Sequence, residues 1–282
     1  MSIRNQRMIY RAFAIVVAVI VVFSATSSNA QILSRGDLFG PGAPPPMIGV
    51  ELGLGSHQQQ GTYQAICHCQ FEGGSATGFL GGLLFELPLN YEWTIGLGAK
   101  FDFKGLNNTT LVGDTATLLL PQQGDSVARG TVFLQRTGTV RETFLTLAPF
   151  VRYEFYRNGP FVQAGPSIGF LLSSNFKHVR ELLGSTITLV DNAGNSAKYN
   201  NIHFANGTNT EELENHKIDN VKTLRLGLLL TVGYDIPVGD NSVIAPMLTY
   251  DLPLTTVRDN ILSKDWKIST IFFSVGLKYK LD

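Results

Sequence analysis

Apolar and polar side chains alternate with a period of two residues between Trp93 and Lys104. One face of this segment consists of Trp93, Ile95, Leu97, Ala99, Phe101 and Phe103, and the other of Thr94, Gly96, Gly98, Lys100 and Asp102. Successive side chains of a β-strand point to opposite sides, so the segment predicts a strand with one fully apolar face. A long apolar face with aromatic ends is typical of a strand that crosses lipid, with its polar face toward a lumen.

Eight segments show this alternation, and we predict that each is a strand. They are residues 48–55, 77–87, 93–104, 144–155, 161–172, 223–236, 243–254 and 267–281. The predicted fold class is all-β, an eight-stranded antiparallel transmembrane β-barrel. The lumen of an eight-stranded barrel is narrow enough for side chains to fill nearly completely.

The predicted connections alternate between short turns and long loops. The turns at 88–92, 156–160 and 237–242 are rich in Gly, Pro, Asn and Asp. The long connections are 56–76, 105–143, 173–222 and 255–266. This asymmetry is typical of outer-membrane barrels, in which short turns face the periplasm and long loops face outward. An even strand number then places both ends of the barrel domain on the periplasmic side.

Some long connections contain patterns of their own. Residues 131–143 continue the alternation into the fourth strand. Residues 185–190 and 198–204 flank Asp191-Asn-Ala-Gly194 and predict a projecting hairpin. Residues 211–214 read Glu-Glu-Leu-Glu and predict a helical turn.

The first 47 residues are predicted to lie outside the barrel domain, which we assign to residues 48–282. Arg4, Arg7 and Arg11 precede a twelve-residue apolar run, and Ser28-Asn29-Ala30 resembles a cleavage site. These features predict a signal peptide over 1–30 and export through the Sec pathway. The apolar run is shorter than the ~20 residues that a membrane-spanning helix needs. Residues 31–47 contain a Pro-rich stretch and predict an extended periplasmic lead-in.

The charge balance argues against a nucleic-acid partner. The chain has 22 basic and 22 acidic residues, and the predicted signal removes three arginines. The mature chain is therefore slightly acidic, whereas nucleic-acid binding usually needs a clustered basic face.

If the apolar faces point outward, many charged residues must point into the lumen. They are Glu51, Glu86, Lys100, Asp102, Arg152, Glu154, Arg225, Asp235, Asp251, Lys278 and Lys280. Acids and bases are nearly balanced, and buried charges are tolerated when they are paired. This favours a lumen closed by ion pairs over an open channel. Lys278 and Lys280 could instead lie at water-exposed strand ends.

Aromatic residues are expected at the two membrane interfaces. Near the short turns we expect Tyr91, Trp93, Tyr153, Phe155, Phe161, Tyr234 and Tyr279. Near the long loops we expect Phe101, Phe103, Phe144, Phe170 and Tyr250. Inward glycines, among them Gly49, Gly53, Gly96, Gly98, Gly165 and Gly227, allow a narrow waist. Pro149, Pro166 and Pro246 lie within predicted strands, where we expect bulges or broken pairing.

Several segments resemble the PorT-like outer-membrane β-barrel family of Bacteroidetes and Chlorobi. Leu147-Ala-Pro149-Phe-Val-Arg-Tyr153 and Ile244-Ala-Pro246-Met-Leu-Thr-Tyr250 repeat one pattern. Gly78-Phe-Leu-Gly-Gly82, the turn exit Gly159-Pro-Phe161 and the end Ser274-Val-Gly276-Leu-Lys-Tyr279-Lys-Leu281-Asp282 add to the likeness. The end is similar to a barrel-assembly signal without its terminal aromatic residue. The resemblance implies an eight-stranded barrel, associated in one member with a secretion apparatus, and no functional residue carries over.

Candidate chemistry is sparse. Cys67-His68-Cys69 lies in the first long loop, where a disulfide is favoured over free thiols and over a metal site that lacks a fourth ligand. All five histidines, His57, His68, His178, His203 and His216, fall in predicted loops. Ser173, His178 and Glu181 could be imagined as a hydrolase constellation, but their spacing carries no signature. We predict no catalytic, cofactor-binding or metal-binding residue.

The sequence therefore predicts a non-enzymatic outer-membrane barrel that is structural or binds a partner through extracellular loops. Its expected partners are outer-membrane lipid, the barrel-assembly machinery and a secretion-apparatus or extracellular protein. The alternatives are a small-solute pore, a barrel enzyme acting on outer-membrane lipid, and a soluble lipocalin-like barrel with its apolar face inside.

Overall fold

The described part of the chain folds almost entirely into β-strands. The computed structural model describes residues 44–64, 70–119, 127–156, 158–184, 186–190, 196–200, 203–204, 206–218, 221–258 and 265–281. The strands are β1 (Met47–Gln60), β2 (Thr62–Gln64), β3 (Gln70–Glu72), β4 (Ser75–Pro88), β5 (Trp93–Leu119), β6 (Val127–Glu154), β7 (Pro160–Leu182), β8 (Thr186–Val190), β9 (Ser196–Asn200), β10 (Thr210–His216), β11 (Leu224–Tyr234), β12 (Ile236–Val238), β13 (Ser242–Pro253) and β14 (Lys267–Lys280). The predicted signal peptide and most of the lead-in lie outside the described residues.

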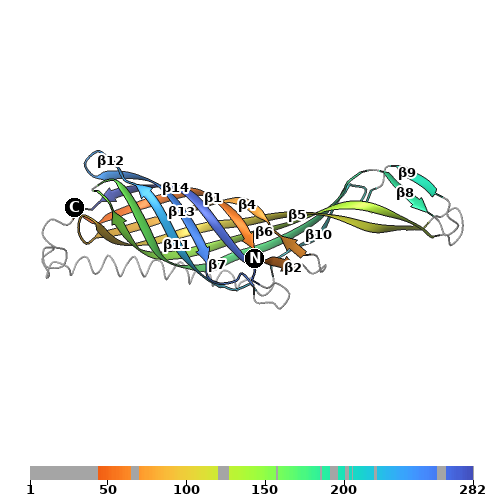
Figure 1. Cartoon of the computed structure of the whole chain (residues 1–282), viewed down its shortest axis with the longest axis horizontal. Helices are drawn as coiled ribbons and strands as arrows, with labels where there is room; N and C mark the ends of the chain where they lie inside the picture. The colour runs from red at the N-terminus through yellow and green to blue at the C-terminus, as the bar shows by residue number, and fades with distance from the viewer. Residues whose placement is uncertain are drawn as a thin grey trace.

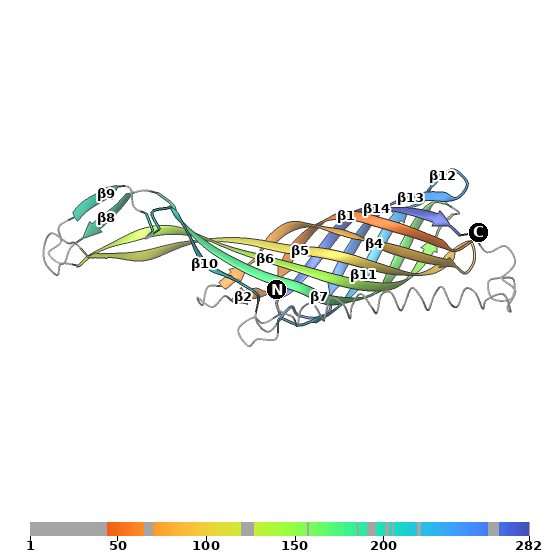
Figure 2. The same ribbon diagram turned by 180° about the vertical axis from the view of Figure 1, so that it is seen from behind.

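Eight long strands close into a barrel (Figures 1 and 2). Neighbours pair antiparallel in the order β1-β4-β5-β6-β7-β11-β13-β14, and β14 pairs with β1 to complete the ring. Each of the eight predicted segments corresponds to one of these strands. The fold class predicted from the alternation is confirmed.

The two faces of the barrel wall differ as the alternation predicts. On β1, for example, Val50 is 47% and Leu52 is 69% exposed on the outside, whereas Glu51 between them is 1% exposed. Lys100 and Arg225 point inward and are buried. The interior is polar and the exterior is apolar, the reverse of the core of a soluble barrel. The lipocalin-like alternative is therefore wrong.

Three strands run far beyond the barrel (Figure 1). The segments 105–143 and 173–222, which the sequence predicts as long loops, are largely strand. β5, β6 and β7 stay paired past Gly105, Arg141 and Asn175, and β10 adds to the free side of β7. We call this four-stranded extension, residues 105–119, 127–141, 175–182 and 210–216, the stalk. The helical turn predicted at 211–214 is wrong, because these residues belong to β10 and pair with β7.

The predicted projecting hairpin is confirmed beside the far end of the stalk. β8 and β9 pair antiparallel between Thr186↔Asn200 and Val190↔Ser196, and β8 touches β6 through Arg129↔Val190. The prediction that residues 131–143 continue the fourth strand is also confirmed, since they form part of β6.

The opposite end of the barrel, which we call the turn end, has short connections as predicted. The hairpins β4–β5, β6–β7 and β12–β13 close there, and Met47 pairs with Lys280. The first strand of the barrel, β1, therefore begins at the turn end, and the last strand, β14, ends there (Figure 1).

Prolines interrupt the pairing of β6 with β7, as predicted. The ladder stops after Leu147↔Ile168 and resumes in the same register at Val151↔Ala164, so Pro149 and Pro166 face each other across the gap. The backbones approach closely here, because a Cβ on Gly165 would overlap the carbonyl oxygen of Pro149. Near Pro246, the ladder to β11 and β12 likewise skips the residues between Met247 and Ile244. These sites are broken pairing rather than bulges.

The residues that the structure describes form no helix that could span a membrane.

Candidate functional site

The lumen contains most of the charged residues that alternation assigned to it. Nine of the eleven are buried, namely Glu51, Glu86, Lys100, Asp102, Arg152, Arg225, Asp235, Asp251 and Lys278. Glu154 and Lys280, nearest the turn end, are only partly buried. The alternative that Lys278 is exposed to water is wrong, since it is 1% exposed.

Five of these residues form one network near the turn end, which we call the turn-end ion cluster: Glu86, Arg152, Glu154, Asp235 and Lys278. Arg152 Nη1 donates to Glu86 Oε1 at 3.0 Å, and its Nη2 contacts Glu154 Oε1 at 3.0 Å and Asp235 Oδ2. Lys278 Nζ lies 3.0 Å from Glu86 Oε2 and 2.9 Å from Asp235 Oδ1. Two cations thus bridge three carboxylates and link β4, β6, β14 and the residue that follows β11.

An aromatic ring completes the turn-end ion cluster. The guanidinium carbon of Arg152 lies 3.7 Å from the ring centre of Phe161, a cation–π geometry. Phe161 is 1% exposed. Its predicted place in the outer aromatic belt is therefore wrong, because Phe161 shares the inward face of β7 with Gly165 and Ser167. The other aromatic residues predicted near the turns are exposed or half-buried on the outside.

A smaller pair lies between the two ends of the lumen. Lys100 Nζ contacts Glu51 Oε2 at 2.7 Å, and Ser274 Oγ donates to Glu51 Oε1 at 2.7 Å. Glycines make this crossing possible, because a Cβ on Gly82 would lie 2.9 Å from the Lys100 side chain. The predicted narrow waist is consistent with this packing.

A second network, the stalk-end ion cluster, consists of Asp102, Lys104, Glu142, Arg225 and Asp251. Lys104 Nζ lies 2.8 Å from both Asp102 Oδ2 and Asp251 Oδ2. Arg225 donates to Asp251 Oδ2 at 2.9 Å and to the Ile268 carbonyl at 3.0 Å. Glu142 is 2% exposed, and its carboxylate makes no hydrogen bond to the described residues. The positively charged side chains of Arg225 and Lys104 attract this carboxylate electrostatically.

Three members of this region were missed from the sequence. The sequence pattern predicts Lys104 only as the end of a strand, and it predicts both Glu142 and His57 as loop residues. His57 lies on β1, is 0% exposed, and its Nδ1 is 2.8 Å from Thr270 Oγ1. The sequence signal for this inward position is that His57 lies two residues after the inward Gly55, so the alternation of β1 continues to it.

Aromatic residues close the lumen at the start of the stalk. We call this cluster the aromatic cap: Tyr63, Phe71, Leu106, Val140, Phe176, Ile218, Val257, Trp266 and Ile268. Tyr63 packs against Trp266 with ring centres 4.6 Å apart and against Phe176 at 4.9 Å. Trp266 is 0% exposed. The short β2–β3 hairpin and the segments beside β11 and β14 thus fold over the mouth of the barrel.

Phe144, predicted at the outer rim near the long loops, is also inside. It is 2% exposed and lies below the cap, 6.0 Å from the Arg225 guanidinium carbon. Phe101, Phe170 and Tyr250 are exposed on the outside, as predicted.

The imagined hydrolase constellation does not form. Ser173 is exposed on the outer face of β7, whereas His178 is buried five residues further along. His178 packs edge-on against Phe71, and its Nδ1 is 4.0 Å from Glu214 Oε1. Glu181 is exposed. The prediction that all histidines lie in loops is wrong for His57, His178 and His216, which lie on β1, β7 and β10.

No metal-binding group of three or more His, Cys, Asp or Glu residues occurs among the residues that the structure describes. Cys67, His68 and Cys69 lie outside the described residues.

The outer face of the stalk carries two large apolar side chains away from the barrel wall. Leu111 on β5 is 68% exposed and Phe133 on β6 is 64% exposed. Since Gly113 pairs with Phe133, Leu111 lies on the diagonal of that pair and on the same face. β4 pairs with β5 only up to Asn107, and beyond Asn108 the backbone of β5 pairs with no other described strand on that side.

The opposite edge of the stalk is charged. On β10, Glu212 contacts Lys177 at 2.8 Å, and Glu211 Oε2 accepts a 2.6 Å hydrogen bond from Arg180 Nε. Hydrogen bonds from Lys177 and Asn215 lower the pKa of the exposed Glu212 carboxyl. Charged side chains discourage another strand from adding to an edge. β5 has no charged residue between Gly105 and Gly113, so the two edges of the stalk differ sharply.

A family model described as "Outer membrane protein beta-barrel domain" matches residues 47–259. No curated protein matches the chain. Among solved structures, the attachment invasion locus protein Ail of Yersinia pestis is 10% identical over 83% of this chain and 99% of its own, with a TM-score of 0.30. OprG from Pseudomonas aeruginosa is 11% identical over 85% of this chain and 97% of its own, with a TM-score of 0.33. Neisserial surface protein A is 11% identical over 83% and 97%, with a TM-score of 0.33.

Proposed function

The chain belongs to the outer membrane protein beta-barrel domain family, and from this premise we propose that it is a non-enzymatic outer-membrane protein that binds a partner protein through its stalk. The observation that carries the proposal is the edge of β5 from Thr109 to Gly113, which has no charged residue, pairs with no described strand on one side and lies beside the exposed Leu111 and Phe133. An extended segment of another protein can add to such an edge through backbone hydrogen bonds, while an apolar side chain beside Leu111 supplies specificity.

The stalk extends from the end of the barrel opposite to the short turns. In outer-membrane barrels the short turns face the periplasm and the long excursions face outward, which supports an extracellular stalk. Export through the Sec pathway is part of the same proposal, supported by the signal-like residues 1–30. The repeated Ala-Pro segments support a PorT-like relationship and a partner in a protein-secretion apparatus.

The two ion clusters and the aromatic cap favour this function over a pore. Arg152 and Lys278 bridge three carboxylates across the lumen at the turn end, and Trp266 packs with Tyr63 at the other end. A water path would have to pass both the buried ion pairs and the cap.

We predict that the purified chain gives no steady current in planar bilayers. The physical reason is that opening a path past Arg152 would separate buried charges from their partners, which is energetically costly. The measurement is single-channel conductance at several voltages, with a porin inserted in a bilayer of the same composition as the positive control. A stable open level in most insertions would favour the small-solute pore instead.

The exposed Ser173 and the buried His178 face opposite sides of β7, which supports a non-enzymatic role. A general base must come within hydrogen-bond reach of its nucleophile or its substrate. His178 instead packs among Phe71 and Phe176 beneath the stalk sheet.

The partner-binding proposal is tested with Leu111→Lys. We expect this change to abolish photo-crosslinks from a probe residue at Thr109 on intact cells, because a lysine at a sheet edge disfavours strand addition. The matched control is Leu213→Lys, since Leu213 is also exposed on an edge strand of the stalk, β10. Equal crosslinking in both variants, or none in the unmodified chain, would contradict binding at β5.

A further inference from the structure

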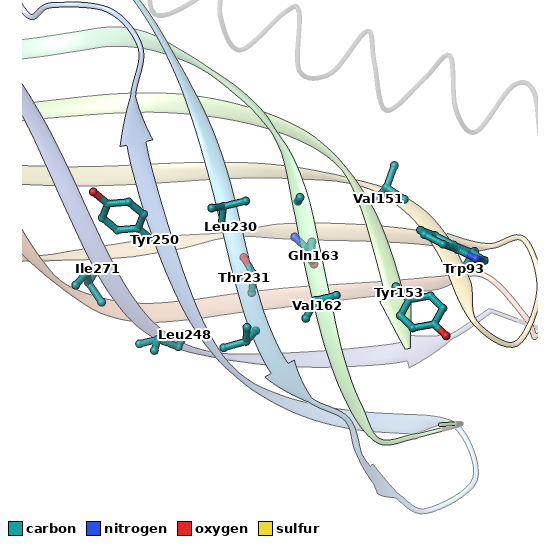
Figure 3. Close-up of a pocket in the computed structure, with 12 residues that line it drawn as sticks. Trp93, Val151, Tyr153, Val162, Gln163, Leu230, Thr231, Leu248, Tyr250 and Ile271 are labelled. Carbon is teal, nitrogen blue, oxygen red and sulfur yellow. The ribbon is translucent and has the colours of Figure 1, made fainter. Parts of the chain in front are cut away.

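The outer surface of the barrel is hollowed by an apolar groove of about 650 Å³ (Figure 3). Its lining includes Trp93, Tyr153, Ala164, Leu230, Tyr250 and Ile271. These residues come from β5, β6, β7, β11, β13 and β14, so the groove crosses most of one side of the barrel.

Strand register explains the shape of the groove. One wall is a row of cross-strand neighbours, Val151–Ala164–Leu230–Tyr250–Ile271, and the other is the row Trp93–Tyr153–Val162–Val232–Leu248. Adjacent rows on one face are two residues apart along each strand. The backbone of the intervening residues, such as Gln163 and Thr231, forms the floor, because these residues lie at inward positions of their strands. Thr231 bonds Thr249 at 2.9 Å, a contact between two buried hydroxyls.

Small side chains keep the groove open. Ala164 offers only a methyl group between Val151 and Leu230, and it directly follows the place where Pro149 and Pro166 interrupt pairing. Larger side chains at its flanks, Leu230 at 44% and Tyr250 at 37% exposure, stand above the floor as walls.

The groove begins at the turn end and rises into the apolar belt. Trp93 is the first residue of β5, and its ring centre lies 5.0 Å from that of Tyr153. Strands of such barrels are tilted by about 35–45° from the membrane normal, so a groove that follows the pairing direction is also oblique and passes from interface to interior. Trp and Tyr at that interface carry polar tips that can donate hydrogen bonds to lipid.

We propose that this groove is a binding site for one glycerophospholipid of the leaflet at the turn end. One acyl chain lies between the two rows, and the glycerol and phosphate lie beside Trp93 and Tyr153. The lining is predominantly apolar, and above the turn end it is continuous with the lipid-facing wall, which favours a hydrocarbon chain over a peptide or a polar solute. The inference rests on the outer-membrane location and is independent of partner binding by the stalk.

A second hollow on the barrel exterior lacks the aromatic end. It has about 360 Å³ and is lined by residues of β1, β4 and β14, among them Leu52, Phe79 and Phe273. No Trp or Tyr borders it, so the same argument does not extend to it.

The test uses the full chain reconstituted in vesicles of phosphatidylethanolamine, a fraction of which carries a diazirine in one acyl chain. After illumination, we expect the adducts to concentrate on peptides that contain Val151, Ala164 and Leu230. Ala164→Phe fills the groove and should lower the yield on those peptides at least fivefold. Ala99→Phe is the matched control, because Ala99 faces outward on β5 between Leu83 and Leu147, outside the groove.

Correct folding of each variant is checked by heat-modifiable migration. If Ala164→Phe fails to fold, the adduct map of the unmodified chain is compared with that of Trp93→Ala. We expect Trp93→Ala to lose adducts at the groove. Adducts spread evenly around the barrel, an equal loss in Ala99→Phe, or preferential capture of a lipid A probe at this groove would overturn the proposal. If the unmodified chain gave no crosslinks from Thr109 while its adduct map was intact, only partner binding by the stalk would be overturned.

Discussion

Replacing Arg152 with methionine should destabilise the barrel more than any other single change in its lumen. Arg152 is 0% exposed and contacts Glu86, Glu154 and Asp235. Methionine preserves much of the volume but leaves three carboxylates with Lys278 alone. Removing one partner of a buried ion pair typically costs about 3–5 kcal/mol. Urea unfolding in phospholipid vesicles, followed by heat-modifiable migration, measures the loss.

Two further variants separate charge pairing from volume. Lys280→Met, at the same end, removes a partly exposed lysine that donates to the Asp240 carbonyl, and should change stability by less than about 1 kcal/mol. Arg152→Met combined with Asp235→Asn leaves the Glu86–Lys278 pair and should recover a large part of the loss. If Arg152→Met matched the unmodified chain, or the double variant were worse than the single one, the turn-end ion cluster would not be a source of stability.

The eight barrel strands could be predicted because lipid imposes a pattern on the sequence. Every outward residue between Trp93 and Phe103 is apolar, so the period of two is visible. The same strand continues as Asn107-Asn-Thr-Thr110, where both faces meet water or a polar partner. Alternation then disappears although the strand does not. The stalk was therefore predicted as loop, apart from residues 131–143, where alternation persists.

The candidate site was only half predictable for a similar reason. Alternation shows which residues point inward, so Arg152, Asp235 and Lys278 could be placed in the lumen. Which of them meet depends on strand register and barrel closure, which bring Asp235 and Lys278, far apart in sequence, within 2.9 Å. No sequence pattern predicts the aromatic cap, because Tyr63 and Trp266 lie in short or irregular segments whose position is set by tertiary packing.

In such a barrel, the position of a residue in the alternation predicts whether its side chain points inward or outward better than the residue type does. Phe161 and Phe144 were assigned to the outer belts because aromatic residues gather at interfaces. Both share a face with inward residues of their strands, Gly165 and Arg152 respectively, and both are buried. Their rings instead lie against the guanidinium groups of Arg152 and Arg225. Residue type becomes informative once the face has been decided.

Leu97→Arg should impair assembly by placing a charge against acyl chains. Leu97 points outward midway along the lipid-facing part of β5, between Phe85 and Pro149 on the neighbouring strands. An arginine on the lipid face near the membrane centre costs roughly 2–4 kcal/mol. We expect a lower folded fraction in outer-membrane preparations and a lower urea midpoint in vesicles, since each 1.4 kcal/mol or so changes the folding equilibrium about tenfold.

The informative control for Leu97→Arg is the same substitution on the same face of the same strand. Leu111→Arg lies on the outward face of β5 in the stalk, where Leu111 is 68% exposed and the surroundings are water. Burial in lipid predicts a large penalty at position 97 and almost none at 111. A soluble barrel, whose exterior meets water throughout, predicts little effect at either position. The two variants share the strand, the outward face and the substitution, and only the surrounding solvent differs. Equal tolerance of both variants would therefore contradict the membrane placement.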